Sequence, residues 1–174
     1  MKRKIILPFL GASVLALISV YFYLGGFNPI ELKLNNCSDL NLVGLDYLGI
    51  PQDETIGEYF REVEAARKNK PLHTIYYIEP EGKRDSLHVF IGYESGVVDQ
   101  KGSIPWTQLS VKCQKVIVAS LKMSRFVMPG PEKTKKAIEA FAQENGLSVT
   151  GIFIDKIISS NHVEVWAPVD FSIE

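Results

Sequence analysis

The last alternating stretch of the sequence carries side chains that could hold an organic cation. In HVEVWAPV (162–169), polar and apolar residues alternate, which is typical of a β-strand with two unlike faces. Glu164 and Trp166 fall on the same face, and a carboxylate beside an indole ring suits a cationic or flat aromatic compound. The alternative is that Trp166 packs on a neighbouring strand while Glu164 points to water.

A second candidate is Asp155, which stands among apolar residues in another strand-like stretch, GIFIDKI (151–157). A half-buried carboxylate in such a place is either paired with a base or has a raised pKa. Asp155 is therefore a candidate counter-charge for a ligand, and the alternative is an exposed strand charge paired with Lys156.

Tyrosines in two other strand-like stretches could add aromatic contacts to the same site. We expect one or two of Tyr76, Tyr77 and Tyr93 to reach it, and the strand register decides which. Tyr77 and Tyr93 are the predicted ligand contacts.

Metal, cofactor and enzyme chemistry find little support in the sequence. His73, His88 and His162 lie far apart, without a cluster of cysteines or acids of the kind that ligates metals. The sequence contains no nucleophile elbow, no phosphate-binding glycine loop and no obvious Ser-His-Asp set. We therefore predict no metal site, no cofactor and no enzyme activity.

The elements that would position these side chains occur twice in the same order. Each set is a strand, a helix and two strands, predicted at 40–49, 55–68, 72–78 and 87–93, and again at 113–127, 131–145, 152–159 and 162–169. Two such units predict an α+β domain with a mainly antiparallel sheet and two helices on one face. A groove between the two units would be a natural place for a ligand.

The N-terminal residues have the pattern of a transmembrane helix. Basic side chains in MKRK precede an uncharged apolar stretch at 5–24, about the ~20 residues that a helix needs to cross a bilayer. The positive-inside rule then predicts a single-pass protein of the cell membrane, with a cytoplasmic N-terminus and the domain on the outer, periplasmic side. A cleaved signal peptide is the alternative. In an oxidising compartment, Cys37 and Cys113 could form a disulfide or remain two buried thiols.

The chain is thus predicted to consist of three parts. These are an N-terminal transmembrane anchor (1–26), a juxtamembrane linker (27–39) and a folded domain (40–174), which contains repeat one (40–93), a joint (94–111) and repeat two (112–169).

The predicted domain resembles the GyrI-like, or AraC effector-binding, domain, which is related to the SOUL haem-binding proteins. The resemblance covers roughly Leu40 to Val169 and rests on the order of the elements and on four stretches, YYIEP (76–80), FVMPGPEKT (126–134), ENGLSVTGIFIDKI (144–157) and VEVWAPV (163–169). It implies a duplicated fold that binds small molecules in a groove. In the family, an acid in the stretch similar to GIFIDKI lies in the ligand groove, often facing a cationic or aromatic compound. Asp155 stands at that position, and Ile157 replaces the family's usual tyrosine.

The sequence therefore predicts a membrane-anchored, non-catalytic binding domain for an amphipathic or cationic organic ligand. Two alternatives stay open: a membrane-anchored protein-interaction module whose groove is filled by its own side chains, and a small-molecule hydrolase. The expected partners are the small molecule, the membrane through residues 5–24, and a membrane or periplasmic protein. With a net charge of −1, nucleic acid is not expected as a partner.

Overall fold

The computed structural model describes residues 3–80, 82, 84–95 and 105–170, with side chains described from Leu10 to Val169 of these ranges. The helices in this part of the chain are α1 (Arg3–Tyr23), α2 (Glu54–Arg67) and α3 (Pro131–Glu144). The strands are β1 (Glu31–Asn36), β2 (Leu40–Gly49), β3 (Leu72–Ile78), β4 (Leu87–Glu94), β5 (Thr107–Val111), β6 (Lys115–Lys122), β7 (Ser148–Val149), β8 (Ile154–Ser159) and β9 (His162–Asp170).

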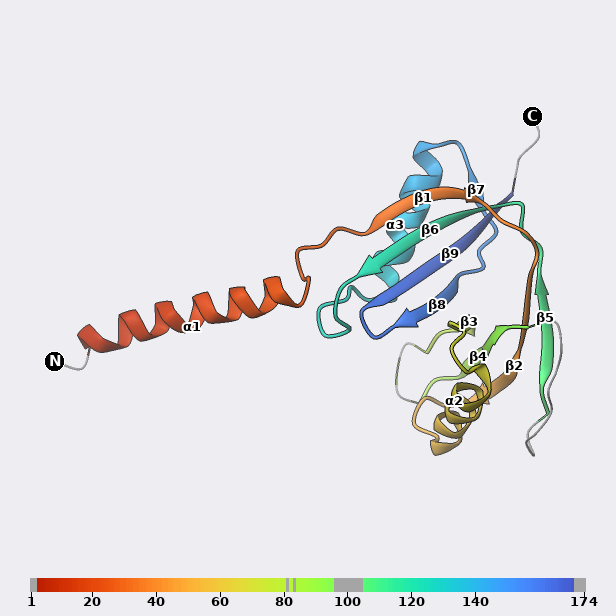
Figure 1. Cartoon of the computed structure of the whole chain (residues 1–174), viewed down its shortest axis with the longest axis horizontal. Helices are drawn as coiled ribbons and strands as arrows, with labels where there is room; N and C mark the ends of the chain where they lie inside the picture. Colours follow the sequence, from red (N-terminus) through yellow and green to blue (C-terminus); the bar gives the residue numbers. More distant parts are fainter. Residues whose placement is uncertain (1–2, 81, 83, 96–104, 171–174) are drawn as a thin grey trace.

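The two repeats form one continuous antiparallel sheet. The strand order is β1-β6-β9-β8-β3-β4-β2-β5, with β7 beside β9 (Figure 1). Repeat one contributes β2, β3 and β4, repeat two contributes β6, β8 and β9, and the two meet where β3 pairs with β8. The α+β class and the largely antiparallel sheet are confirmed. The predicted domain boundaries stay predictions, and residues 96–104 of the joint and 171–174 lie outside the described residues.

Both repeat helices begin and pack as their sequences predict. Asp53 caps α2 by accepting a hydrogen bond from the backbone N–H of Thr55 at 2.9 Å. Gly146 follows α3 with φ +64°, the left-handed conformation that glycine adopts without strain after a helix. Val63 of α2 and Ile138 of α3 are fully buried, each in the core of its own repeat.

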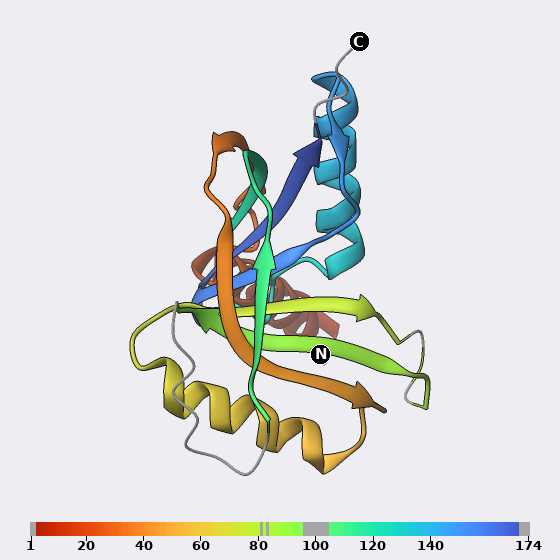
Figure 2. The ribbon, with the colours of Figure 1, turned by 90° about the vertical axis from the view of Figure 1, so that its right-hand side faces the viewer.

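The strand register shows that the two helices cover the same face of the sheet. Leu45 pairs with Ile91, Ile91 with Thr74, Thr74 with Asp155, and Asp155 with Val165. Paired residues in neighbouring strands point to the same face. This row begins in the core under α2 and ends in the core under α3, the two helices that Figure 2 shows beside different parts of the sheet. Asp155 therefore lies on the helix-covered face, next to the contact between the repeats.

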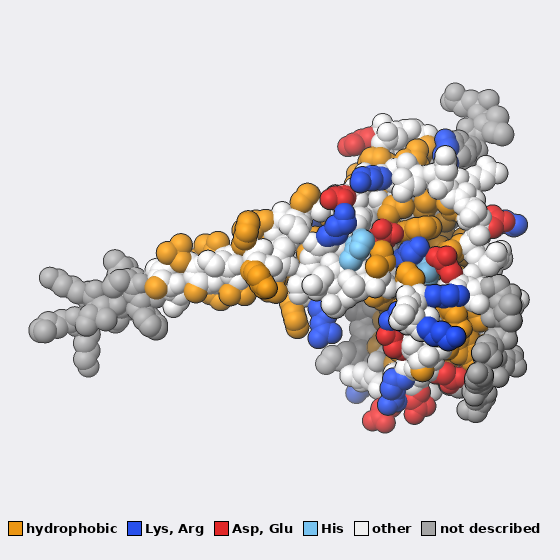
Figure 3. Space-filling view, viewed as in Figure 1, with side chains coloured by type: hydrophobic (Ala, Val, Ile, Leu, Met, Phe, Trp, Pro, Cys, Tyr) orange, Lys and Arg blue, Asp and Glu red, His pale blue; other side chains and the backbone are white. Residues whose placement is uncertain are grey.

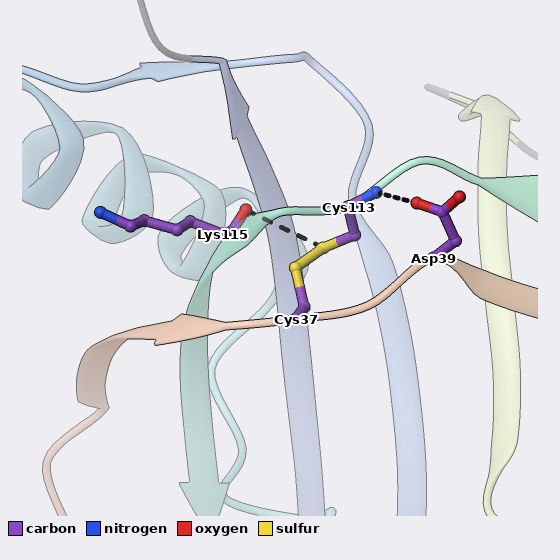
Figure 4. Close-up of a disulfide and its surroundings, with 4 residues drawn as sticks. All are labelled: Cys37, Asp39, Cys113 and Lys115. Carbon is purple, nitrogen blue, oxygen red and sulfur yellow. Dashed lines mark hydrogen bonds between the residues drawn. A yellow bond between two sulfur atoms is a disulfide. The ribbon is translucent and has the colours of Figure 1, made fainter.

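Two short strands outside the predicted repeats cross between them. β1 precedes repeat one but pairs with β6 of repeat two, and β5 precedes repeat two but pairs with β2 of repeat one. Cys37 and Cys113 lie where these crossing segments meet and form a disulfide with a Cα–Cα distance of 5.6 Å (Figure 4). Asp39 supports the crossing because its Oδ1 accepts a hydrogen bond from the Cys113 N–H at 3.0 Å. The disulfide, one of two outcomes left open by the sequence, joins residues 76 positions apart.

α1 extends away from the two repeats and carries exposed apolar side chains (Figures 1 and 3). Within the described residues, however, no helix is both long and apolar enough to span a bilayer. This finding contradicts the predicted location in the cell membrane with the domain on the outer side, and the predicted anchor at 5–24 has no support from it.

Candidate functional site

A cavity of about 430 Å³ opens on the helix-covered face, with walls from both repeats. The first repeat contributes Tyr76 of β3 and Glu79, which follows that strand. The second repeat contributes the first turn of α3, strands β8 and β9, and the segments before α3 and β8. The apolar wall of the cavity is formed by Leu121, Met128, Phe153, Val163 and Val165.

Two carboxylates and one ammonium group lie in this cavity. Lys135 forms an ion pair with Glu79, and its Nζ is 5.2 Å from the centre of the Phe153 ring. Asp155 makes no hydrogen bond or ion pair with any described residue, although it lines the same cavity. Of the two carboxylates, Glu79 therefore has a cationic partner, whereas Asp155 has none among the described residues.

The surroundings of Asp155 raise the pKa of its carboxyl group. Burial, together with the negative charge of Glu79, raises the pKa of Asp155 from 3.8 to about 6, and Lys135 opposes this rise only in part. Burial and the same two carboxylates also raise the pKa of the Tyr76 phenol. At neutral pH the cavity therefore combines an ionised, poorly solvated carboxylate with apolar and aromatic walls, which suits an organic cation.

The structure does not bring Glu164 and Trp166 to Asp155. Asp155 pairs with Val165, so the residues on either side of Val165 point to the opposite face of the sheet. There the Trp166 indole donates a hydrogen bond to Glu164 Oε2 at 2.9 Å, and Lys156 Nζ lies 4.4 Å from the centre of its ring. The two predicted contacts thus satisfy each other outside the cavity.

The two predicted tyrosines also lie outside the cavity. Tyr77 is exposed and its ring lies 4.7 Å from that of His88. Tyr93 is buried in the core of repeat one, edge-on to Trp106 at 6.1 Å. Tyr76 is the tyrosine that reaches the cavity, because neighbouring residues of a strand point to opposite faces.

The sequence reasoning did not name Glu79, Lys135 or Phe153, which line the cavity, and it named Tyr76 only as one of three tyrosines that could reach the site. A usable signal was present, because the cavity is lined almost entirely by the short stretches on which the family resemblance rests, at 76–80, 126–134, 144–157 and 163–169.

A second polar cluster lies on the opposite face, close to the disulfide. His73 is fully buried, and neither ring nitrogen makes a hydrogen bond within the described part of the chain. Its Nε2 lies 3.4 Å from Glu94 Oε1, the oxygen that also pairs with Lys156 at 3.1 Å. Burial lowers the pKa of His73 to about 4, so the imidazole is neutral at physiological pH. Among the described residues no group of acids, histidines and cysteines is arranged to hold a metal ion.

The duplicated α+β architecture places the chain among a class of solved structures with the same fold. No protein-family model and no curated protein sequence matches the chain. A hydrolase from Listeria innocua superimposes with a TM-score of 0.58 at 12% identity, over 83% of this chain and 95% of that one. The EcmrR C-terminal domain gives 0.54 at 10% identity, over 81% and 98% of the two chains.

SAV2435 bound to tetraphenylphosphonium gives a TM-score of 0.52 at 17% identity, over 81% of this chain and 94% of that one. At such identities the likeness concerns the fold alone. It is consistent with the GyrI-like fold expected from the sequence.

Proposed function

We propose that this protein is a non-catalytic binding domain for a small amphipathic organic cation, held between the two repeats with Asp155 as its counter-charge. The observation that carries the proposal is a half-buried carboxylate, without a hydrogen-bond or ion-pair partner among the described residues, in an apolar and aromatic cavity of about 430 Å³. Burying an unpaired charge is unfavourable, and a bound cation would remove that cost. Tyr76 and Phe153 would supply the aromatic surface on which such a cation packs.

Two further observations support this reading. The solved structure of SAV2435 holds tetraphenylphosphonium, a lipophilic cation, on the same fold. The open cavity also favours a ligand over the predicted interaction module, whose groove would be filled by its own side chains. Trp166 does not fill the cavity, because it packs on the opposite face of the sheet.

The test is calorimetric titration of the protein with tetraphenylphosphonium at pH 8, where Asp155 is ionised. Replacing Asp155 by asparagine keeps the shape and removes the charge, so we expect affinity to fall by about tenfold or more. Glu139→Gln is the matched control, because it removes an exposed carboxylate from α3 and should leave affinity unchanged. Equal affinity in wild type and Asp155→Asn, or no binding by the wild type, would refute the proposal.

Hydrolysis of a small molecule is the second candidate, favoured by the raised pKa of Asp155, which suits a general acid or base. Mass spectrometry of candidate substrates separates the two functions. Turnover that disappears in Asp155→Asn would support hydrolysis, whereas unchanged compounds that still bind would support the binding domain.

A further inference from the structure

The cavity contains a cation of its own, and this cation is bound to only one of the two carboxylates. Lys135 pairs with Glu79, and its ammonium group also faces the Phe153 ring at 5.2 Å. The pair is partly shielded from water, since the side chains of Lys135 and Glu79 are 22% and 33% exposed. Ion pairs that are partly removed from water are screened less than surface pairs. Lys135 therefore neutralises Glu79 inside the cavity and leaves one unbalanced negative charge, at Asp155.

The backbone fixes Lys135 in this position. Pro131 begins α3, and Thr134, one residue before Lys135, is 2% exposed and lines the cavity. The buried Thr134 holds the first turn of the helix against the sheet, so Lys135 leaves the helix beside Glu79. The backbone of Lys135 therefore lies beside the cavity, and Glu79 and the Phe153 ring are the contacts of its ammonium group there.

We propose that the Lys135–Glu79 pair determines the charge of the ligand, so that the cavity selects organic cations with one positive charge over those with two. A monocation satisfies Asp155 and leaves the existing pair intact. A dication brings a second positive charge into a cavity whose other carboxylate is already occupied, and it either repels Lys135 or has to displace it. This inference rests on the proposed function, because it concerns the same cavity and adds the charge class of its ligand.

The test compares two aromatic probes of similar size. The dication is methyl viologen, and the monocation is N-methyl-4-phenylpyridinium, in which a phenyl ring replaces one of the two charged rings. Lys135→Met removes the ammonium group and keeps an unbranched side chain against Phe153. Lys136→Met is the matched control, since it makes the same change at the next, exposed residue of α3. Affinities are measured by calorimetry at pH 8, and thermal melting shows that each variant is folded.

In the wild type the monocation should bind more tightly than the dication. In Lys135→Met both probes gain affinity, but the ratio of dication to monocation affinity should rise by about tenfold, because electrostatic attraction scales with ligand charge. Glu79→Gln should act in the opposite direction and weaken the monocation, since it leaves the Lys135 charge without its partner beside Asp155.

The outcomes separate the two proposals. If the monocation binds the wild type but the ratio is the same in Lys135→Met and Lys136→Met, the charge selection is refuted while the binding function stands. If neither probe binds the wild type, the binding function fails and the selection fails with it.

Discussion

Asp155→Asn should make this protein more stable at neutral and alkaline pH. Because the pKa of Asp155 is about 6 in the folded protein and ordinarily 3.8, the unfolded chain loses this proton first as pH rises. Between about pH 4 and pH 6 the folded state therefore binds more protons than the unfolded state, and the contribution of Asp155 to stability falls. The difference between the folded and unfolded pKa values corresponds to about 3 kcal/mol of unfolding free energy, which we reduce to about 2 kcal/mol because the side chain is partly accessible to water.

The assay is thermal and denaturant unfolding of wild type and Asp155→Asn at pH 4 and pH 8. For a chain of this size about 2 kcal/mol corresponds to a rise in Tm of roughly 5 °C, expected at pH 8 and absent at pH 4. Glu139→Gln, which removes an exposed carboxylate from α3, should leave Tm nearly unchanged at both pH values. A variant that is less stable than the wild type at pH 8, or equally stabilised at both pH values, would refute the view that this carboxylate is half-buried and has no partner among the described residues.

His73→Leu should remove a destabilisation that appears in acid, because the pKa of His73 is about 4 in the folded protein and 6.5 ordinarily. The unfolded state binds the extra proton, so wild-type stability is lost as pH falls from about 6.5 to 4. Denaturant unfolding at these two pH values should show a smaller loss in the variant. The same dependence of unfolding free energy on pH in both proteins would contradict the burial of His73. In the double variant Cys37→Ser with Cys113→Ser the free energy of unfolding should fall by about 4 kcal/mol, because the disulfide closes a long loop of the unfolded chain. The variant should therefore unfold at a lower denaturant concentration. Adding a reductant to the wild type should reproduce that loss, and an unchanged midpoint under reduction would contradict a structural role for the bond.

The repeats could be read from the sequence because their signals are local. β2 and β3 have the predicted bounds, since alternating or β-branched runs end at turn residues, and α2 ends before Pro71 as expected. β1 was missed and assigned to a linker. Its strand residues are almost all exposed, so they show no buried periodicity, and the pairing partner that makes them a strand lies far along the chain in β6.

Of the predicted ligand contacts only Asp155 lines the cavity, and strand parity explains why. Successive residues of a strand face opposite ways. Asp155 pairs with Val165, so Glu164 and Trp166 lie on the face opposite to Asp155, and a shift of the β8–β9 pairing by one residue would place them on the same face. A single sequence shows the alternation in each strand but not the pairing between strands. The same parity separates Tyr76, in the cavity, from Tyr77, outside it.

The contact between the two repeats holds a titratable group on each face, and the difference between them argues for function at Asp155. His73 and Asp155 lie on paired strands, and burial shifts both pKa values toward the neutral form. At pH 7 the imidazole is neutral and adds no charge beside the Glu94–Lys156 pair, which is already balanced. Asp155 is instead ionised at the same pH and has no hydrogen-bond or ion-pair partner in the part of the chain that the structure describes. The crossed strands and the Cys37–Cys113 disulfide join the repeats elsewhere, so the fold can retain this unfavourable charge where both repeats line one cavity. A charge retained in such a position is what a site for a cation requires.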